Sequence, residues 1–224
     1  MNQDIIHVYF MPGMAASPKI FENIQLPENQ FKIHYLEWLI PERDETLEAY
    51  AIRMTQKIKH ENLVLVGVSF GGVLVQEMSK HLKLKRLIII SSVSSKHELP
   101  KRMRIARKTK AYAIAPTSLV SHIDMFAKYA FGSNVKKRIE LYKKYLSVND
   151  KRYLDWALKN MVCWNQDKPI PEAIHIHGDQ DMVFPCHHIT NCIKIKGGTH
   201  IMIINKFKWF NENLPKLILN GRLD

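Results

Sequence analysis

The hydrophobic positions of this chain form short runs, separated by turn residues and by segments of helical periodicity. The runs stop at residues that terminate strands, such as Pro12-Gly13, Pro41 and Gly67. Most of them are apolar without alternation, which predicts strands buried on both faces, as in a parallel sheet. The predicted strands lie at residues 5–10, 31–38, 63–66, 86–92, 173–177 and 192–195.

Between these strands, apolar residues recur at helical spacing. Ser17 before Pro18 is typical of an N-cap followed by proline at the first helical position, which predicts a short helix through residue 24. Asp44 can cap a second helix, and further helices are predicted at 73–82 and from about 205 to 217. The apolar face of the helix after Asp44 comprises Leu47, Ala51, Met54 and Ile58. Alternating strands and helices predict an α/β fold, with a mostly parallel sheet of about six strands and helices on both faces.

The alternation breaks between residues 94 and 167, where only helical patterns occur. These patterns cover residues 125–131, 135–146 and 152–161, and the next strand begins after Pro171. The sequence therefore predicts one α/β core formed by residues 1–93 and 168–224. A helical insertion at residues 94–167 interrupts this core.

The composition is that of an ordinary globular protein. The chain has 224 residues, of which 46% are hydrophobic and 24% charged, enough for one domain with a full core. No stretch approaches the ~20 apolar residues that span a bilayer, and the first residues lack the pattern of a signal peptide. The three cysteines form no CxxC pair, which favours reduced thiols. We therefore expect a cytoplasmic protein without a membrane span.

The net charge of +12 raises the question of a nucleic-acid partner. No recognisable nucleic-acid-binding motif accompanies the charge, so no such partner is expected. Much of the charge lies between residues 96 and 159. Its strongest cluster comprises Lys101, Arg102, Arg104, Arg107, Lys108 and Lys110. These side chains fit a solvated helix face, and the alternative is that they attract an anionic substrate or an acidic carrier.

One motif follows the strand at 63–66. Gly67-Val68-Ser69-Phe70-Gly71 stands between this strand and a helical pattern, the arrangement of a nucleophile elbow. The sharp turn exposes the serine and brings strand and helix nearly into contact, which requires glycine two positions before and after it. The helix N-terminus directs free N–H groups and partial positive charge to the same place. The alternative is a glycine-rich turn with an incidental serine.

Two further motifs supply the groups that a serine nucleophile needs. A hydroxyl becomes reactive when an imidazole takes its proton, and a carboxylate orients that imidazole. His177-Gly178-Asp179-Gln180-Asp181 follows one predicted strand, and Gly197-Gly198-Thr199-His200 follows the last. Because the carboxyl ends of parallel strands share one edge of the sheet, Ser69, Asp181 and His200 can converge.

With these three motifs in this order, the chain resembles the α/β-hydrolase superfamily over nearly its whole length. The resemblance implies that Asp181 is the acid and that Asp179 closes the turn by bonding local backbone N–H groups. Some members carry the acid one strand earlier, but residues 91–95 of this chain offer no carboxylate. The resemblance also implies that the helical insertion is a lid.

The family forms its oxyanion hole from two backbone N–H groups. The resemblance implies Phe70 as one donor and a residue in the loop after the first strand as the other. The family often has His-Gly in that loop, whereas this chain has Pro12-Gly13-Met14, which makes Met14 the expected donor. The alternative for Met14 is packing beneath the insertion.

The expected substrate pocket combines residues of the core and of the lid. Gly13 and Trp38 are the candidates from the core, with packing as the alternative role for Trp38. The candidates from the lid are apolar residues that could line the roof of the site: Met125, Phe126, Tyr129, Phe131 and Trp164.

The sequence gives no reason to expect a metal or another cofactor. Cys186-His187-His188 with Cys192 has the residue types of metal ligands, but the spacing fits no standard zinc pattern. His175, which alternates with His177 on a predicted strand, is interpreted as a core or edge residue rather than a catalytic base.

These patterns predict a serine hydrolase that cleaves a carboxylic ester or thioester of a small acyl group through an acyl-enzyme. One alternative is C–C bond hydrolysis or acyl transfer by the same triad, which a fold cannot distinguish. A second alternative is a hydrolase-fold binding protein or receptor with slow turnover. A dehalogenase reaction is disfavoured because the elbow residue is serine rather than aspartate.

Overall fold

The computed structural model describes residues 4–114, 144–145 and 148–223. Its six strands form one parallel sheet in the order β2-β1-β3-β4-β5-β6, which confirms the predicted fold class. The largest difference from the predicted bounds is in the second strand, which ends at Tyr35 rather than at Trp38. The strands are β1 (Ile6–Met11), β2 (Phe31–Tyr35), β3 (Leu63–Val68), β4 (Arg86–Ile90), β5 (Ile174–Gly178) and β6 (Ile193–Ile195).

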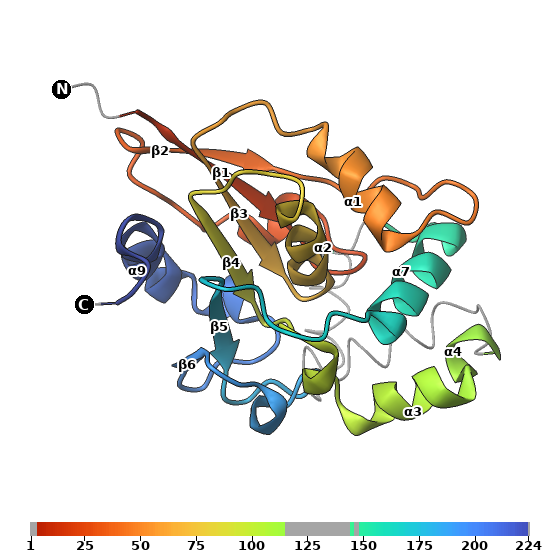
Figure 1. Ribbon diagram of the computed structural model, residues 1–224. Coiled ribbons are helices and arrows are strands. Elements are labelled where there is room, and N and C mark those ends of the chain that lie inside the picture. Colours follow the sequence, from red (N-terminus) through yellow and green to blue (C-terminus); the bar gives the residue numbers. More distant parts are fainter. Residues whose placement is uncertain (1–3, 115–143, 146–147, 224) are drawn as a thin grey trace.

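Helices cover both faces of the sheet (Figure 1). On one face lie α1 (Leu47–Thr55), α2 (Phe70–Ser79) and α7 (Lys151–Cys163). On the other lie the 3-10 turn η1 (Pro18–Phe21), α8 (Met202–Asn205) and α9 (Phe207–Asn220). The remaining described elements are η2 (Lys96–Glu98), α3 (Lys101–Thr109), α4 (Ala111–Ile114) and η3 (Cys186–His188).

Two hydrophobic cores explain why the strands are apolar without alternation. Successive residues of a strand point to opposite faces of the sheet. Leu65 and Ile89 pack on the side of α1 and α2, whereas Val66 and Ile90 pack on the side of α9. All four side chains are completely buried. Each central strand therefore needs apolar residues at every position.

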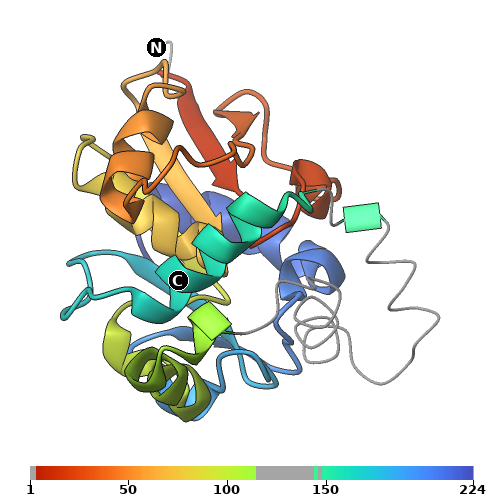
Figure 2. The ribbon, with the colours of Figure 1, turned by 90° about the vertical axis from the view of Figure 1, so that its right-hand side faces the viewer.

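The helix α7, whose sequence lies in the predicted insertion, packs against the helices on one face of the sheet. It packs against α2, α3 and α4, and it runs across the molecule in front of α2 in Figure 2. Tyr153 and Trp156 are buried in the same cluster as residues of α1 and α2. The predicted helix at 152–161 is confirmed, whereas 125–131 and almost all of 135–146 lie outside the described residues. The division into core and lid stays a prediction.

The first two predicted helix starts have different outcomes. Thr46 caps α1, and its Oγ1 accepts a hydrogen bond from Ala49 N at 3.1 Å. Asp44 has a φ of 57°, whereas an N-cap requires extended backbone, which Thr46 provides. Ser17 occupies the predicted N-cap position before Pro18, although its side chain makes no capping hydrogen bond, and η1 is a 3-10 turn that ends at Phe21 rather than at residue 24. Among the helices that the structure describes, none is long and apolar enough to cross a membrane.

Candidate active site

The turn between β3 and α2 has the geometry of a nucleophile elbow. Ser69 has φ 53° and ψ −122°, a combination that residues other than glycine rarely adopt. A Cβ on Gly67 would lie 2.4 Å from the Gly71 carbonyl oxygen, so strand and helix approach too closely for a side chain. A Cβ on Gly71 would lie 2.3 Å from the Pro12 carbonyl oxygen. The second glycine therefore makes room for the loop after β1 as well as for the elbow.

The structure brings together the three predicted triad residues. The Oγ atom of Ser69 lies 2.9 Å from His200 Nε2, and His200 Nδ1 lies 2.9 Å from Asp181 Oδ2. A neutral imidazole with its proton on Nδ1 donates to the carboxylate and accepts the serine proton at Nε2. The side chain of Asp181 is completely buried, and that of His200 is only 11% exposed. This arrangement can activate the Ser69 hydroxyl.

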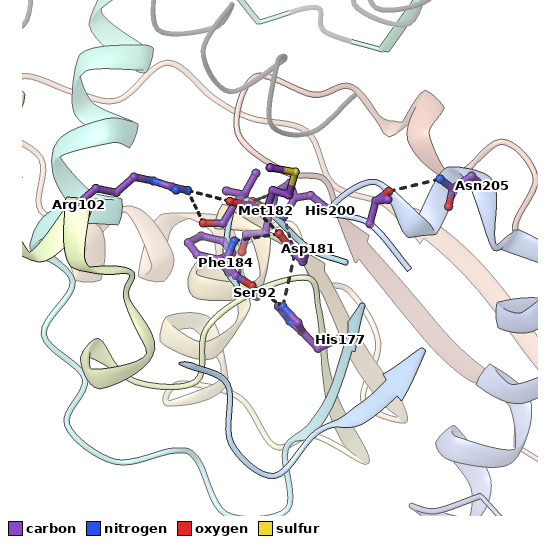
Figure 3. Close-up of polar contacts among 11 residues, drawn as sticks. Ser92, Arg102, His177, Asp181, Met182, Phe184, His200 and Asn205 are labelled. Atoms are coloured by element: carbon purple, nitrogen blue, oxygen red, sulfur yellow. Dashed lines mark hydrogen bonds and ion pairs between the residues drawn. The ribbon is translucent and has the colours of Figure 1, made fainter. Parts of the chain in front are cut away.

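Asp181 is held ionised by its surroundings. Its Oδ1 accepts hydrogen bonds from the backbone N–H groups of Val183 and Phe184, at 2.8 and 2.9 Å. Burial by itself raises the pKa of Asp181, but the charge and hydrogen bond of His200, together with the Phe184 N–H, outweigh it. The pKa of this carboxyl is therefore below its ordinary value. Figure 3 shows Asp181 between His200 and His177.

His177 is a buried neighbour of Asp181 that the sequence did not identify as part of the site. Its Nε2–H donates to the Phe184 carbonyl at 2.8 Å and lies 3.5 Å from Asp181 Oδ2. Burial lowers the pKa of His177, although the Asp181 charge opposes the shift. The neutral His177 ring therefore lies beside the Asp181 carboxylate, near its Oδ2 atom. Its place at the start of His-Gly-x-x-Asp was the available signal.

Asp179 has a different role from the one predicted. Its Oδ1 accepts the N–H of Gly197 at 2.7 Å, so its partner belongs to the loop that precedes His200. The Gln180 N–H donates to the Gly198 carbonyl at 2.9 Å, a second link between the same loops. Asp181 itself bonds the local N–H groups. Asp179 therefore contributes to the relative position of Asp181 and His200 by holding their loops together.

The loop after β1 contacts Ser69 as expected for an oxyanion loop. A Cβ placed on Gly13 would lie 3.4 Å from the Ser69 Cβ, so this loop lies directly against the nucleophile. Met14, half-buried, follows at once, and Phe70 is the first residue of α2, where N–H groups have no partner within the helix. Their assignment as oxyanion donors stays a prediction.

Trp38 fixes the same loop. Its indole N–H donates to the Gly13 carbonyl at 2.8 Å, and its ring stacks on Phe70 with 5.2 Å between centroids and an angle of 10°. The side chain is buried. Trp38 thus contacts both segments that carry the expected oxyanion donors. It is a packing residue that lies next to the proposed site.

Two polar residues that support the site were missed from the sequence. Ser92 Oγ donates to the Ser69 carbonyl at 2.7 Å, and the Tyr153 hydroxyl accepts from the Ala15 N–H at 3.2 Å. Ala15 has a φ of 63°, so the oxyanion loop, like the elbow, contains a residue in the left-handed region. Neither contact has a sequence signal, because the partners are 23 and 138 residues apart.

Of the pocket residues predicted in the insertion, the structure describes Trp164. Trp164 does not reach the triad: its indole N–H donates to Glu77 Oε1 at 2.7 Å, roughly 12 Å along α2 from Ser69. It lines a groove of about 320 Å³ that also includes Leu47 and Asn160. Trp164 caps the end of α7, and burial of its ring against α2 determines its place. The other candidates lie outside the described residues: Met125, Phe126, Tyr129 and Phe131.

The basic cluster lies on α3, and part of it has structural partners. Arg102 donates to the Met182 and Val183 carbonyls, at 3.2 and 2.6 Å, next to Asp181. Arg107 donates to the Trp164 carbonyl at 3.1 Å. Both contacts attach α3 to the rest of the molecule. An anionic substrate or an acidic carrier at this helix stays a prediction.

The cysteine and histidine cluster near β6 does not form a ligand group. Within the described parts of the chain, Cys186, His187, His188 and Cys192 do not come together as three or more ligand atoms. The three cysteines are free thiols.

Solved structures share this architecture. The chain superposes on a bromoperoxidase from Bacillus anthracis with a TM-score of 0.71 at 19% identity, covering 97% of this chain and 93% of that one. A thermophilic esterase from Thermogutta terrifontis gives 0.68 at 12% identity, covering 97% and 90%. An extracellular α/β-hydrolase from a Paenibacillus species gives 0.62 at 14%, covering 94% and 98%.

These likenesses identify the architecture of the chain. It has the α/β-hydrolase fold, and its described residues form six parallel strands with helices on both faces. No protein-family model matches the sequence. No curated protein matches it either. At identities of 12–19% the structural likeness concerns the fold, and the chemistry must be argued from the site.

Proposed function

We propose that this protein is a serine hydrolase that cleaves a carboxylic ester or thioester of a small acyl group through an acyl-enzyme. The observation that carries the proposal is the hydrogen-bonded series from Ser69 Oγ through His200 to the buried Asp181, with both distances at 2.9 Å. The strained elbow supports it, because such backbone strain persists where function requires it. The esterase from Thermogutta terrifontis has the same fold.

The chemistry follows from the positions of these groups. Ser69 Oγ attacks the acyl carbon while His200 Nε2 takes its proton, and Asp181 stabilises the imidazolium that forms. The negative charge that develops on the carbonyl oxygen is stabilised by the N–H groups of Phe70 and Met14. His200 then returns its proton to the leaving alcohol or thiol. Water, activated by the same histidine, hydrolyses the acyl-enzyme and restores Ser69.

The loop that carries Met14 is held rigidly from three sides. Trp38 holds the Gly13 carbonyl, Tyr153 holds the Ala15 N–H, and Gly71 accommodates the Pro12 carbonyl. Donors fixed before the reaction need no reorganisation when the oxyanion forms, which is the source of their effect. Proline at the position where the family often has histidine is therefore compatible with an ordered oxyanion loop.

The proposal is tested by hydrolysis of p-nitrophenyl esters of graded chain length, alongside acyl-CoA thioesters and a diketone. We expect the short-chain esters or thioesters to be the best substrates. A fluorophosphonate probe should label the protein, because it reacts with an activated serine. Ser69→Ala should abolish labelling and reduce turnover by on the order of 10⁶.

Ser79→Ala is the matched control, because Ser79 lies on the same helix and its hydroxyl bonds only the Gln76 carbonyl among the described residues. This variant should retain labelling and turnover. Labelling that survives Ser69→Ala would assign the reaction to another residue. Preferential cleavage of the diketone would favour C–C hydrolysis, and labelling absent from the wild type would favour a binding protein.

A further inference from the structure

Three histidines that are far apart in the sequence meet at the face of the sheet covered by α1. His7 lies in β1, His34 in β2, and His60 in the loop before β3. Their ligand nitrogens lie within 4.8 Å of one another. His7 Nδ1 is 2.8 Å from His34 Nε2, and the rings of His7 and His60 stack with 3.6 Å between centroids.

We propose that His7, His34 and His60 form a binding site for one divalent transition-metal ion of the zinc class. Imidazole nitrogens are good ligands for Zn²⁺, Co²⁺, Ni²⁺ and Cu²⁺. Three histidines and one open position form a common four-coordinate zinc arrangement. Each of the three side chains is half-buried, so solvent can supply the fourth ligand. No carboxylate belongs to this group, so the ligand set is neutral.

Tyr9 determines which nitrogen of His60 is free to bind a metal. The Tyr9 hydroxyl lies 2.6 Å from His60 Nδ1, and it accepts the Lys59 N–H at 3.1 Å. With Nδ1 held by Tyr9, His60 offers Nε2 as its ligand atom. A hydrogen bond to the second ring nitrogen is the usual partner of a metal-bound histidine, because it fixes the orientation of the ring.

His7 and His34 share one proton between the two facing nitrogens. The metal takes the place of that proton, which moves to the far nitrogen of the same ring, so both rings stay neutral. Burial lowers the pKa of His7 and of His34, and the charges of His60 and then of Lys32 lower both further. Neutral imidazole is the form that binds a metal.

Metal binding requires the His60 ring to turn out of its stack on His7, because a bound metal lies in the plane of each imidazole and these two rings are nearly parallel, at 6°. With Zn–N bonds of about 2.05 Å, tetrahedral ligand nitrogens lie about 3.4 Å apart. The distance of 2.8 Å between His7 Nδ1 and His34 Nε2 must increase slightly. The longer distances between ligand nitrogens, which are at most 4.8 Å, must decrease. His7 and His34 are fixed on adjacent paired strands, whereas His60 lies on the loop between α1 and β3. Movement of His60 therefore completes the site.

Lys32 is an unfavourable neighbour for a cation. It pairs with His7 across β1 and β2, and its charge acts on both His7 and His34. A cation near the metal weakens binding by repulsion. Lys32→Gln should therefore tighten zinc binding severalfold, the opposite direction from the loss of a ligand.

The histidine site is separate from the proposed active site. His7 lies near the start of β1, whereas Gly13 follows its end, roughly 20 Å further along the chain. A metal at this place cannot touch the substrate of Ser69. We expect it to stabilise the association of β1, β2 and the loop before β3, independently of ester hydrolysis.

The experiment is a zinc titration of the EDTA-treated, dialysed full chain by calorimetry, with Co²⁺ absorption as a measure of coordination. We expect one Zn²⁺ per chain, a tetrahedral Co²⁺ spectrum, and a melting temperature that rises with metal concentration. His34→Gln and His60→Gln should each weaken binding at least about 100-fold. Tyr9→Phe should weaken it about tenfold, because His60 loses its orienting partner.

The controls are His187→Gln and His200→Gln, which remove histidines elsewhere and should retain zinc binding. His34→Gln should keep the fluorophosphonate labelling of Ser69, which distinguishes failure of this site from failure of the proposed function. Absence of zinc binding by the wild-type chain would overturn the proposal. Unchanged binding by His60→Gln, a loop substitution outside the strands, would also overturn it.

Discussion

At the scale of single residues, Ser69 shows how a strained conformation is maintained. Its backbone lies in a region that costs on the order of 1–3 kcal/mol for a residue other than glycine. The Ser69 N–H donates to Ile90 O at 2.9 Å, and the Ser69 carbonyl accepts from Gly72 N at 2.9 Å. Ser92 Oγ adds a third contact, to the same carbonyl. These bonds offset the strain and place the hydroxyl toward His200.

Removal of the Ser92 hydroxyl tests this support. Ser92→Ala should lower kcat about tenfold with little change in KM, because the nucleophile is displaced while the binding surface is kept. Steady-state kinetics with a p-nitrophenyl ester measure both constants. Ser91→Ala is the matched control, since the buried Ser91 Oγ has no hydrogen-bond partner among the described residues. Equal losses of kcat in both variants would contradict the proposed support.

At the scale of elements, α7 contacts two loops that follow strands of the sheet. Asp150 caps the helix by accepting the Tyr153 N–H at 2.9 Å. The Tyr153 hydroxyl reaches Ala15 in the oxyanion loop, and the Trp156 indole donates to the Glu45 carbonyl at 2.7 Å. The helix therefore links the loops after β1 and β2. The helix α7, predicted within the insertion, thus has buried contacts with both loops.

Loss of the Tyr153 hydroxyl should affect catalysis more than its small change in volume suggests. Tyr153→Phe leaves the buried Ala15 N–H without its acceptor and loosens the oxyanion loop, so kcat should fall about tenfold. Tyr50→Phe is the control, because its hydroxyl bonds Leu39 N and Leu39 O, outside the oxyanion loop. It should cost about 1–2 kcal/mol of unfolding free energy with kcat nearly unchanged. An unchanged kcat for Tyr153→Phe, together with a lowered kcat for Tyr50→Phe, would exclude this role for α7.

At the scale of the whole molecule, stability should fall in mild acid because of buried histidines. Burial, followed by the charge of His177, lowers the pKa of His175 to about 4, whereas Glu98 and Asp181 act in the opposite direction. The unfolded chain takes up this proton near pH 6.5, and the folded chain only near pH 4. The contribution is therefore complete above pH 6.5 and is lost as the pH falls toward 4.

Urea unfolding at pH 7 and pH 5 measures this effect. His175 alone should reduce the free energy of unfolding by about 2 kcal/mol between these pH values. His175→Gln should remove that part of the difference, whereas His187→Gln, at an exposed position, should leave it in place. If His175→Gln shows the full wild-type difference, another group is responsible.

The elements and motifs were predictable because their signals are local. Short segments rich in β-branched and aromatic residues placed all six strands, and Gly67, Ser69 and Gly71 indicated the elbow from five consecutive residues. The predicted start of α1 was wrong because the conformation of the preceding turn decided which residue caps the helix. Thr46 rather than Asp44 caps α1 because the turn before it places Asp44 at positive φ.

The sequence by itself determined the strands, the α/β class, and the three motifs that supply a hydroxyl, an imidazole and a carboxylate, because each depends on residues that are near neighbours along the chain. Only the tertiary structure decided which distant groups meet: Ser92 at the elbow, Tyr153 at the oxyanion loop, Trp164 at Glu77 rather than at the triad, and the histidines of β1, β2 and the loop before β3. Strand order and helix packing create these contacts, and their spacing along the chain carries no periodic signal.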